Sequence, residues 1–390
     1  MAPTSTIAAA RLVTGGSERF DVVIEVAGGL VAAVRDRTPG ERCDIEITTG
    51  VLAPGLVDMQ VNGVFGVDFA AAGRDDWAMV AGRLPETGVT AFAPTFITAP
   101  VADLAESLRR VAAVHAQPPP GARVLGAHVE GPFLAANRRG AHNLVHLCDP
   151  TREAVAALLG AAAPGSLAVV TLAPEREHAL DAIATLTAAG VLVSVGHSDA
   201  TGDQVAAAAD AGARAVTHLF NAQRPLHHRE PGVPGHALVD HRLALGLIVD
   251  LHHVAADVVR LAFRAAGERI VLVTDAVASA GMPPGRYELG GEPVLVETGR
   301  PPVRVDGTLA GSALRLDEAV RNTVELGVPL TVAIDAATRR PADLLGRGDL
   351  GRVEPGAAAD LTWLGPDLVA RATWIAGEPV FGVGALLVLK

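Results

Sequence analysis

The sequence predicts an α/β protein, a (β/α)8 barrel of the TIM type with a small β domain built from both chain termini. Three observations lead to this prediction. The chain has 390 residues, of which 49% are hydrophobic, so it can bury a large core. Eight short apolar runs alternate with alanine-rich helical stretches, which is typical of a parallel sheet covered by helices. Short β-like stretches, separated by Gly and Pro, lie near the two ends.

The eight apolar runs give the predicted strands of the barrel. In chain order they are Leu56–Val61, Ala91–Ile97, Val124–Val129, Leu167–Leu172, Val191–Val195, Ala215–Leu219, Leu245–Val249 and Ile270–Val273. Eight strand–helix units over this length indicate a closed barrel. We expect this domain to span residues 54–352, with Arg286–Thr308 forming an insertion of β-hairpin character after the eighth strand.

The small β domain is expected to contain residues 1–53 and 353–390. Its candidate strands are Phe20–Val26, Leu30–Val34, Cys43–Thr48, Ala359–Leu364, Thr373–Ile375 and Ala385–Leu389. Because chain termini often lie close together, we expect the two ends to pair into one domain.

Composition excludes several classes of protein. The net charge is −11 and there is no basic stripe, which argues against nucleic acid as a partner. We find no signal peptide and no apolar run long enough to cross a bilayer, so no membrane partner is expected. The two cysteines, Cys43 and Cys148, form no C-x-x-C motif, which fits a reducing cytoplasm. The only lysine is Lys390, which argues against Schiff-base catalysis, a P-loop and a metal pair bridged by a carboxylated lysine.

Three strand ends carry candidate metal ligands. Catalytic groups of such barrels lie at the carboxyl ends of the strands, and here these ends place Glu130 in AHVEGP, His197 in SVGHSDA and His218 in VTHLFNA. One carboxylate and two imidazoles with an open fourth position are typical of a catalytic zinc site. Each histidine alone could equally be a hydrogen-bonded rim or core residue. Their equivalent positions on three strands favour the metal.

The first and last strands add further polar groups. Asp275 ends the eighth strand, where it could be a turn or N-cap aspartate. Beside a metal it could instead take a proton from the activated water and pass it to the leaving group. Asp58, Gln60 and Asn62 alternate along the first strand and so share one face, where many metal hydrolases carry His-x-His.

The remaining histidines are assigned by position. His128 lies inside the third strand and is expected in the core or just behind the metal ligands. The seventh strand ends with His252 and His253. Surface or packing positions are expected for His115, His146, His178, His236 and His241.

Several motifs together resemble one family. The pieces PGLVDMQVNG, HVEGPFL, RRGAHN, GHSDA, THLFNAQRPLHHREPG, VTDAVASAG and GTLAGS follow one another in the order found in N-acetylglucosamine-6-phosphate deacetylases of the amidohydrolase superfamily. The resemblance covers nearly the whole chain. It implies hydrolysis of N-acetylglucosamine 6-phosphate to glucosamine 6-phosphate and acetate, a step of amino-sugar catabolism.

Two alternatives stay open beside this reading. One is a deacetylase of N-acetylgalactosamine 6-phosphate or of another N-acyl sugar phosphate. The other is a catalytically silent barrel that serves as a ligand sensor or scaffold. The second is disfavoured because the candidate metal ligands and Asp275 are all present.

The resemblance also implies roles for individual residues. His142 resembles the histidine that polarises the substrate carbonyl; taken alone, it would be a loop histidine bonded to backbone. Arg229 resembles a phosphate-binding arginine that in a homodimer can reach the neighbouring active site. The full set of implied substrate-binding residues is Ala141, Asn221, Ala222, Arg229, His253, Leu309, Ala310 and Gly311.

The resemblance further implies the number of metal ions. Family members with His-x-His on the first strand can hold two metals, whereas those with Gln-x-Asn resemble mononuclear enzymes. We therefore expect one divalent ion per subunit, with Zn²⁺ suited to the ligands and Fe²⁺ compatible. Gln60 and Asn62 are expected to bind a water at the vacant second-metal position. The sequence assigns no role to His227, His228 or the insertion near Pro284–Pro302.

Overall fold

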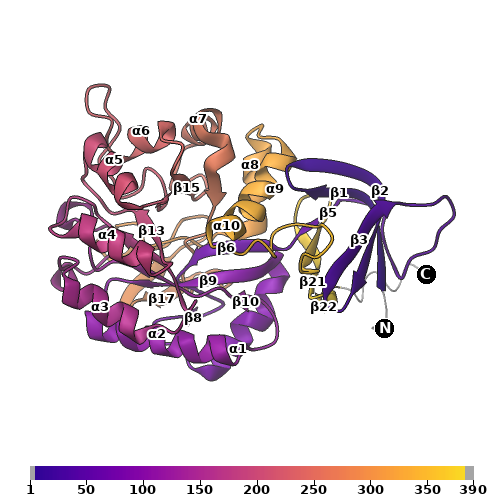
Figure 1. Cartoon of the computed structure of the whole chain (residues 1–390), viewed down its shortest axis with the longest axis horizontal. Helices are drawn as coiled ribbons and strands as arrows, with labels where there is room; N and C mark the ends of the chain where they lie inside the picture. Colours follow the sequence, from indigo (N-terminus) through magenta and orange to yellow (C-terminus); the bar gives the residue numbers. More distant parts are fainter. Residues whose placement is uncertain (1–4, 383–390) are drawn as a thin grey trace.

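The computed structural model describes residues 5–382 and confirms the predicted barrel (Figure 1). The eight strands of the barrel are here called staves. Neighbouring staves pair in parallel, and each stave overlaps one of the eight predicted apolar runs. The staves are β6 (Leu56–Val61), β9 (Val89–Ile97), β11 (Ala127–Glu130), β12 (Leu167–Leu172), β13 (Leu192–Val195), β14 (Ala215–Val216), β15 (Ala244–Leu247) and β16 (Ile270–Leu272). A short strand, β10 (Arg123–Val124), pairs with β9 just before β11.

The barrel closes between its first and last staves. In the segment after β16, the backbone N–H of Asp275 donates to the carbonyl of Gln60 at 2.9 Å. Val61 and Ala276 form a parallel bridge one step further along. Closure at this seam brings the carboxyl ends of β6 and β16 to the same rim.

Ten helices within the described residues surround or flank the staves. They are α1 (Arg74–Arg83), α2 (Val101–Ala116), α3 (Arg152–Ala161), α4 (Ala179–Ala188), α5 (Gly202–Ala211), α6 (Gly232–Val239), α7 (Ala256–Ala266), α8 (Leu316–Glu325), α9 (Leu330–Ala337) and α10 (Arg339–Leu344). α5 starts at a capping box, in which the side chains of Thr201 and Gln204 each accept the other's backbone N–H. Between residues 5 and 382, no helix has the length and apolar composition needed to cross a membrane.

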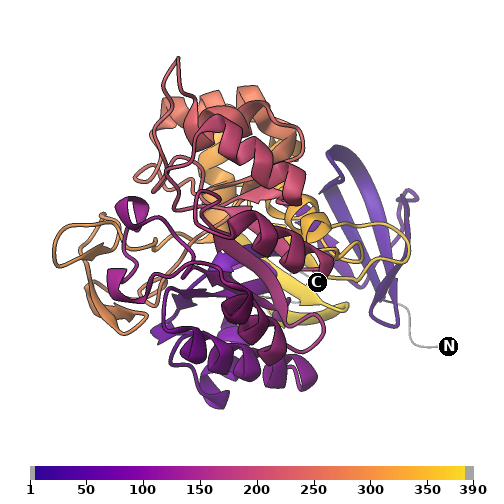
Figure 2. The ribbon, with the colours of Figure 1, turned by 60° about the vertical axis from the view of Figure 1, so that its left-hand side comes forward.

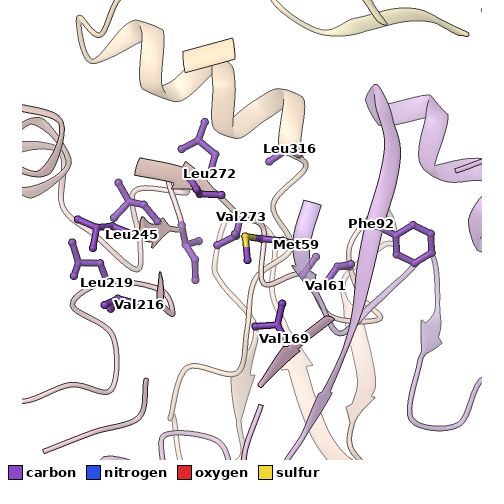
Figure 3. Packing of buried hydrophobic residues seen from close by; sticks show 14 of the residues in the cluster. Met59, Val61, Phe92, Val169, Val216, Leu219, Leu245, Leu272, Val273 and Leu316 are labelled. Carbon is purple, nitrogen blue, oxygen red and sulfur yellow. The ribbon is translucent and has the colours of Figure 1, made fainter. Parts of the chain in front are cut away.

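One apolar cluster joins the staves to the helices. Figure 3 shows side chains of β6, β9, β12, β14, β15 and β16 in this cluster, together with Leu316, the first residue of α8. These side chains are almost completely buried, and burying a large aliphatic or aromatic side chain contributes about 1.5–3 kcal/mol. The rim that carries the polar strand ends therefore rests on a packed scaffold.

A separate sheet, here called the terminal sheet, unites the two ends of the chain beside the barrel (Figure 1). Its strands are β1 (Ser5–Thr14), β2 (Ser17–Ala27), β3 (Leu30–Asp36), β4 (Ile45–Ile47), β5 (Val51–Pro54), β20 (Leu361–Leu364), β21 (Ala370–Ile375) and β22 (Glu378–Phe381). β1 pairs with β2, β4 and β5, although the sequence did not predict it as a strand. The predicted strand Ala385–Leu389 lies outside the described residues, and the domain boundaries at residues 53 and 353 stay a prediction.

The insertion after β16 is a small antiparallel sheet, here called the inserted sheet. It contains β17 (Gly285–Leu289), β18 (Glu292–Val296) and β19 (Val303–Arg304). The predicted hairpin is thus present as β17 and β18, and β19 adds a third strand. In Figure 2 this segment, drawn in orange, stands on the side of the barrel away from the terminal sheet.

One ion pair links the terminal sheet to the barrel and provides a test of that contact. Asp360 is buried, accepts two hydrogen bonds from the guanidinium of Arg123 at 2.7 and 3.0 Å, and accepts a third from the backbone of Ala376. Asp360→Ala should lower the free energy of unfolding by about 2–4 kcal/mol, because a half-buried arginine loses its partner. Urea denaturation measures this loss. Asp367→Ala, which breaks an exposed pair with Arg371, is the control and should change little.

Candidate active site and metal centre

A pocket opens at the carboxyl ends of the staves. Polar side chains from the ends of several staves and from one loop converge in its lining: Asn62, Glu130, His142, His197, His218 and Asp275. The pocket therefore lies where barrels of this kind carry their catalytic groups.

The structure brings the three predicted metal ligands together. His218 Nε2 lies 3.0 Å and His197 Nε2 3.2 Å from Glu130 Oε1, and the two Nε2 atoms are 3.1 Å apart. All three side chains are at most 6% exposed. Burial alone would raise the pKa of Glu130, but the hydrogen bonds to His197 and His218 hold that pKa well below its usual range. One carboxylate oxygen and two imidazole nitrogens in contact form a set that could hold a divalent ion.

The orientation of the imidazole rings fits such an ion. His197 Nδ1 lies 2.9 Å from the carbonyl of Arg138, which can only accept, so Nδ1 carries a proton and Nε2 is the nitrogen left for an ion. His218 Nδ1 is buried without a hydrogen-bond partner among the described residues. His197, His218 and Asp275 all have positive φ, at 47°, 28° and 50°. Such strained backbone is typical of functional sites.

Asp275 lies beside this group and is held by amides. Asn62 Nδ2 donates to Asp275 Oδ1 at 2.7 Å. Gln60 Nε2 lies 3.3 Å from the same oxygen and 3.2 Å from Glu130 Oε2. Burial, together with the charge of Glu130, raises the pKa of Asp275 to about 6. Gln60 and Asn62 thus act on Asp275 directly; whether they also bind a water stays a prediction.

His142 faces the pocket from the loop after β11. The backbone N–H of Thr98 donates to His142 Nδ1 at 3.2 Å, and the Thr98 hydroxyl lies 2.8 Å from the same nitrogen. The ring proton is therefore on Nε2. Burial and the neighbouring His197 hold the pKa of His142 well below its usual range, so the ring is neutral. A neutral imidazole with a free Nε2–H can donate a hydrogen bond to an acyl oxygen.

Below the rim, the barrel interior is polar. His128 Nε2 lies 2.7 Å from the hydroxyl of Thr171, which contacts Thr217, and Thr217 contacts Ser194. All four side chains are buried. This places His128 in the core behind the candidate ligands, as expected.

A second buried contact lies under Asp275. Asp58 accepts a 2.6 Å hydrogen bond from the hydroxyl of Thr274, the residue before Asp275. Burial raises the pKa of Asp58 to about 7. The alternation along β6 thus predicted the shared face of Asp58, Gln60 and Asn62, but not the support that Asp58 gives to the last stave.

Most of the implied substrate-binding residues line the pocket: Ala141, Asn221, Ala222, His253, Leu309 and Gly311. His253 is held by Asp250 at 2.7 Å, whereas His252 is exposed. Ala310 is fully buried and does not line the pocket. Arg229 is exposed beside His228 and is likewise not in the lining of this subunit's pocket, so its contact across a dimer stays a prediction.

Sequence reasoning missed several residues of the pocket wall: Ile97, Asn137, Arg138, Gly140, Leu289 and Thr308. Leu289 belongs to β17 of the inserted sheet and Thr308 to the segment after it, so the insertion has a place in the site. Thr98 was also missed, although it directly follows the end of a predicted strand, which was the signal used for Glu130 and Asp275.

A barrel whose stave ends gather two histidines and a glutamate around an aspartate defines a metal-dependent barrel hydrolase. Comparison with known proteins makes the class specific. The model of the amidohydrolase family matches residues 51–380, and the chain belongs to this family, whose members depend on metal ions.

Individual relatives cover nearly the whole chain. An N-acetylgalactosamine-6-phosphate deacetylase of Escherichia coli O157:H7 is 40% identical over 381 residues, which are 96% of this chain and 99% of that protein. An N-acetylglucosamine-6-phosphate deacetylase of Homo sapiens is 40% identical over 350 residues, 86% of this chain and 84% of that protein. The Mycobacterium smegmatis N-acetyl-D-glucosamine-6-phosphate deacetylase, solved as a variant with N-acetyl-D-glucosamine-6-phosphate, superimposes with a TM-score of 0.91 at 36% identity, covering 97% and 100% of the two chains.

The buried His128 predicts a pH dependence of stability. Burial lowers its pKa to about 4, against about 6.5 for an exposed histidine. Between these values the unfolded chain binds the proton and the folded chain does not, so stability falls as the pH falls from 6.5 towards 4. Between pH 7 and pH 5, the free energy of unfolding of the wild-type protein should fall by about 2 kcal/mol more than that of the His128→Gln variant. Urea denaturation at both pH values measures the difference; equal losses would contradict the assignment.

Proposed function

We propose that this amidohydrolase removes the acetyl group of N-acetylglucosamine 6-phosphate, giving glucosamine 6-phosphate and acetate. The observation that carries the proposal is the pocket that joins a Glu–His–His group, a carboxylate beside it and a neutral histidine. Relatives that bear the name of this activity support the choice of substrate. N-acetylgalactosamine 6-phosphate is the second candidate, because the Escherichia coli O157:H7 relative named for it matches 96% of the chain.

The proposed cofactor is one divalent ion held by Glu130, His197 and His218. Zn²⁺ suits one carboxylate and two imidazoles, and Fe²⁺ accepts the same donors. When bound, such an ion polarises a carbonyl and makes a water molecule a better nucleophile. The remaining chemistry falls to the protein's own side chains.

Asp275 is proposed to move the proton. Both amide donors, from Gln60 and Asn62, reach Oδ1, which leaves Oδ2 to accept the proton of the attacking water. The same carboxyl group then gives this proton to the departing nitrogen, which leaves as an amine.

His142 is proposed to bind the acyl oxygen. Its Nε2–H can donate to this oxygen as negative charge develops, which is the task of an oxyanion donor. Thr98 fixes the tautomer through Nδ1. A low pKa keeps the ring neutral, so that no proton is exchanged in place of the hydrogen bond.

The phosphate is proposed to contact Asn221 and Ala222, and another part of the substrate to contact His253. All three line the pocket, and Asn221 and Ala222 lie on the loop after β14, which carries His218. With no lysine before Lys390, a further cation must be arginine or histidine. Arg229 of a neighbouring subunit is proposed to supply it in a homodimer.

The direct test is to assay the metal-loaded protein with both 6-phosphates and with unphosphorylated N-acetylglucosamine. Release of acetate and free amine in equal amounts from N-acetylglucosamine 6-phosphate, with little from the unphosphorylated sugar, is expected. Preference for the galacto compound would favour the second candidate. No acetate from any N-acyl sugar phosphate would leave the silent-barrel alternative.

Asp275→Asn should keep the shape of the site but lose the proton carrier. kcat should fall by about 10²–10⁴-fold, the usual range for a lost acid or base. The metal content should be unchanged, because Glu130, His197 and His218 remain. Steady-state kinetics and elemental analysis on one sample measure both quantities. A variant that loses its metal would show that Asp275 is a ligand.

His218→Ala and His197→Ala should each lose bound metal and activity together, because two remaining donors hold a divalent ion poorly. Elemental analysis after gel filtration measures the metal. His236→Ala is the matched control, since His236 pairs with Asp240 away from the pocket. Full occupancy in the two site variants would contradict the ligand assignment.

A further inference from the structure

The loop that carries His142 is attached to the inserted sheet. We propose that Arg304 and Glu292 are positioning residues for His142: they hold the segment Ala141–Asn143 so that His142 Nε2 meets the acyl oxygen. This inference rests on the proposed function, because it concerns the residue assigned there to the carbonyl.

The contacts lie on both sides of His142. Arg304 donates through one terminal nitrogen to the carbonyl of Ala141. Its other terminal nitrogen pairs with Glu292 at 2.9 Å. The second carboxylate oxygen of Glu292 accepts from the side-chain amide of Asn143 at 3.2 Å. One ion pair thus binds the residue before His142 and the residue after it.

Apolar packing makes the same connection independently. Ala141 packs against a small cluster that joins the inserted sheet to the barrel: Val277, Leu289, Val294 and Ala310, with Ile97 and Val296 at its edge. Leu289 and Val294 come from β17 and β18. The loop is therefore fixed to the inserted sheet by an ion pair and by an apolar contact.

Two further contacts hold His142 itself. Thr98 bonds the ring of His142, and Arg139 donates to its carbonyl from within the loop itself. Neither contact holds Ala141. Arg304 does not line the pocket, and its side chain is 19% exposed, so it acts through the loop rather than on the substrate.

Small shifts of this loop would reach the reacting atoms. At Gly140 an added Cβ would lie 3.3 Å from His197 Cε1, so the loop backbone runs close to a candidate ligand. The centroids of the His142 and His197 rings are 4.2 Å apart. A displacement of about 1 Å in a catalytic group can cost about 10²-fold in rate.

The test compares Arg304→Ala with Arg300→Ala, which removes an exposed ion pair from the same insertion. Arg304→Ala should lower kcat about 10- to 100-fold and change KM and metal content little. Glu292→Gln, which keeps the shape but not the charge, should give a smaller loss in the same direction. Arg300→Ala should behave like the unchanged protein. A loss confined to KM, or wild-type kcat in Arg304→Ala with normal metal content, would overturn the proposal.

A double-mutant comparison separates positioning from general damage. In a His142→Ala background, Arg304→Ala should cause no further loss of kcat, because its effect passes through His142. A substrate with an N-trifluoroacetyl group, whose carbonyl needs less polarisation, should reduce the loss in both single variants. An equal loss with and without His142 would show that Arg304 only stabilises the fold, and would overturn the proposal.

Hydrogen–deuterium exchange gives a measurement that does not depend on activity. Peptides covering residues 135–147 should exchange faster in Arg304→Ala than in Arg300→Ala or the unchanged protein. Unchanged exchange would overturn the attachment itself. If the wild-type protein hydrolyses no N-acyl sugar phosphate while Arg304→Ala still exchanges faster, that result would contradict the proposed function and support the attachment of the loop.

Discussion

Closure of the barrel between β6 and β16 is the constraint on which the site depends. The backbone of Asp275 bonds to the carbonyl of Gln60, and below this seam Asp58 accepts from Thr274. The side chain of Gln60 then lies between Asp275 and Glu130. Gln60 on the first stave can contact both Glu130 on the third and Asp275 beyond the last only because the first and last staves touch. The residues that close the fold are thus also those that orient its proposed acid and base.

The stave ends depart from extended backbone at the positions that carry function. His197, His218 and Asp275 all adopt left-handed φ, which costs about 1–3 kcal/mol per residue. Surrounding hydrogen bonds hold this conformation: the carbonyl of His197 accepts from Ala135, and that of Asp275 accepts from Ser312. The apolar cluster that joins the staves to the helices supplies the rigidity that makes such strain tolerable.

Position and periodicity explain what could be predicted from the sequence. Glu130 and Asp275 each end an apolar run, so their place on the rim followed from the barrel. β1 could not be predicted from its alanine-rich sequence, because alanine is depleted in strands and its pairing with β2, β4 and β5 decides its conformation. The parts played by Thr98 and Arg304 depend on contacts 44 and 163 positions away along the chain. Such contacts leave no local pattern.

The ion pairs of the described residues use arginine or histidine as the cation, as in Arg123–Asp360 and Arg304–Glu292. Lysine pairs lose their charge near pH 10.4, about the pKa of that side chain, whereas arginine stays charged. Alkaline solution should therefore leave these arginine ion pairs intact at pH values where lysine ion pairs are lost. The same choice has a practical result: amine-directed coupling reagents find no lysine side chain among the described residues, so they leave the residues that line the pocket unmodified.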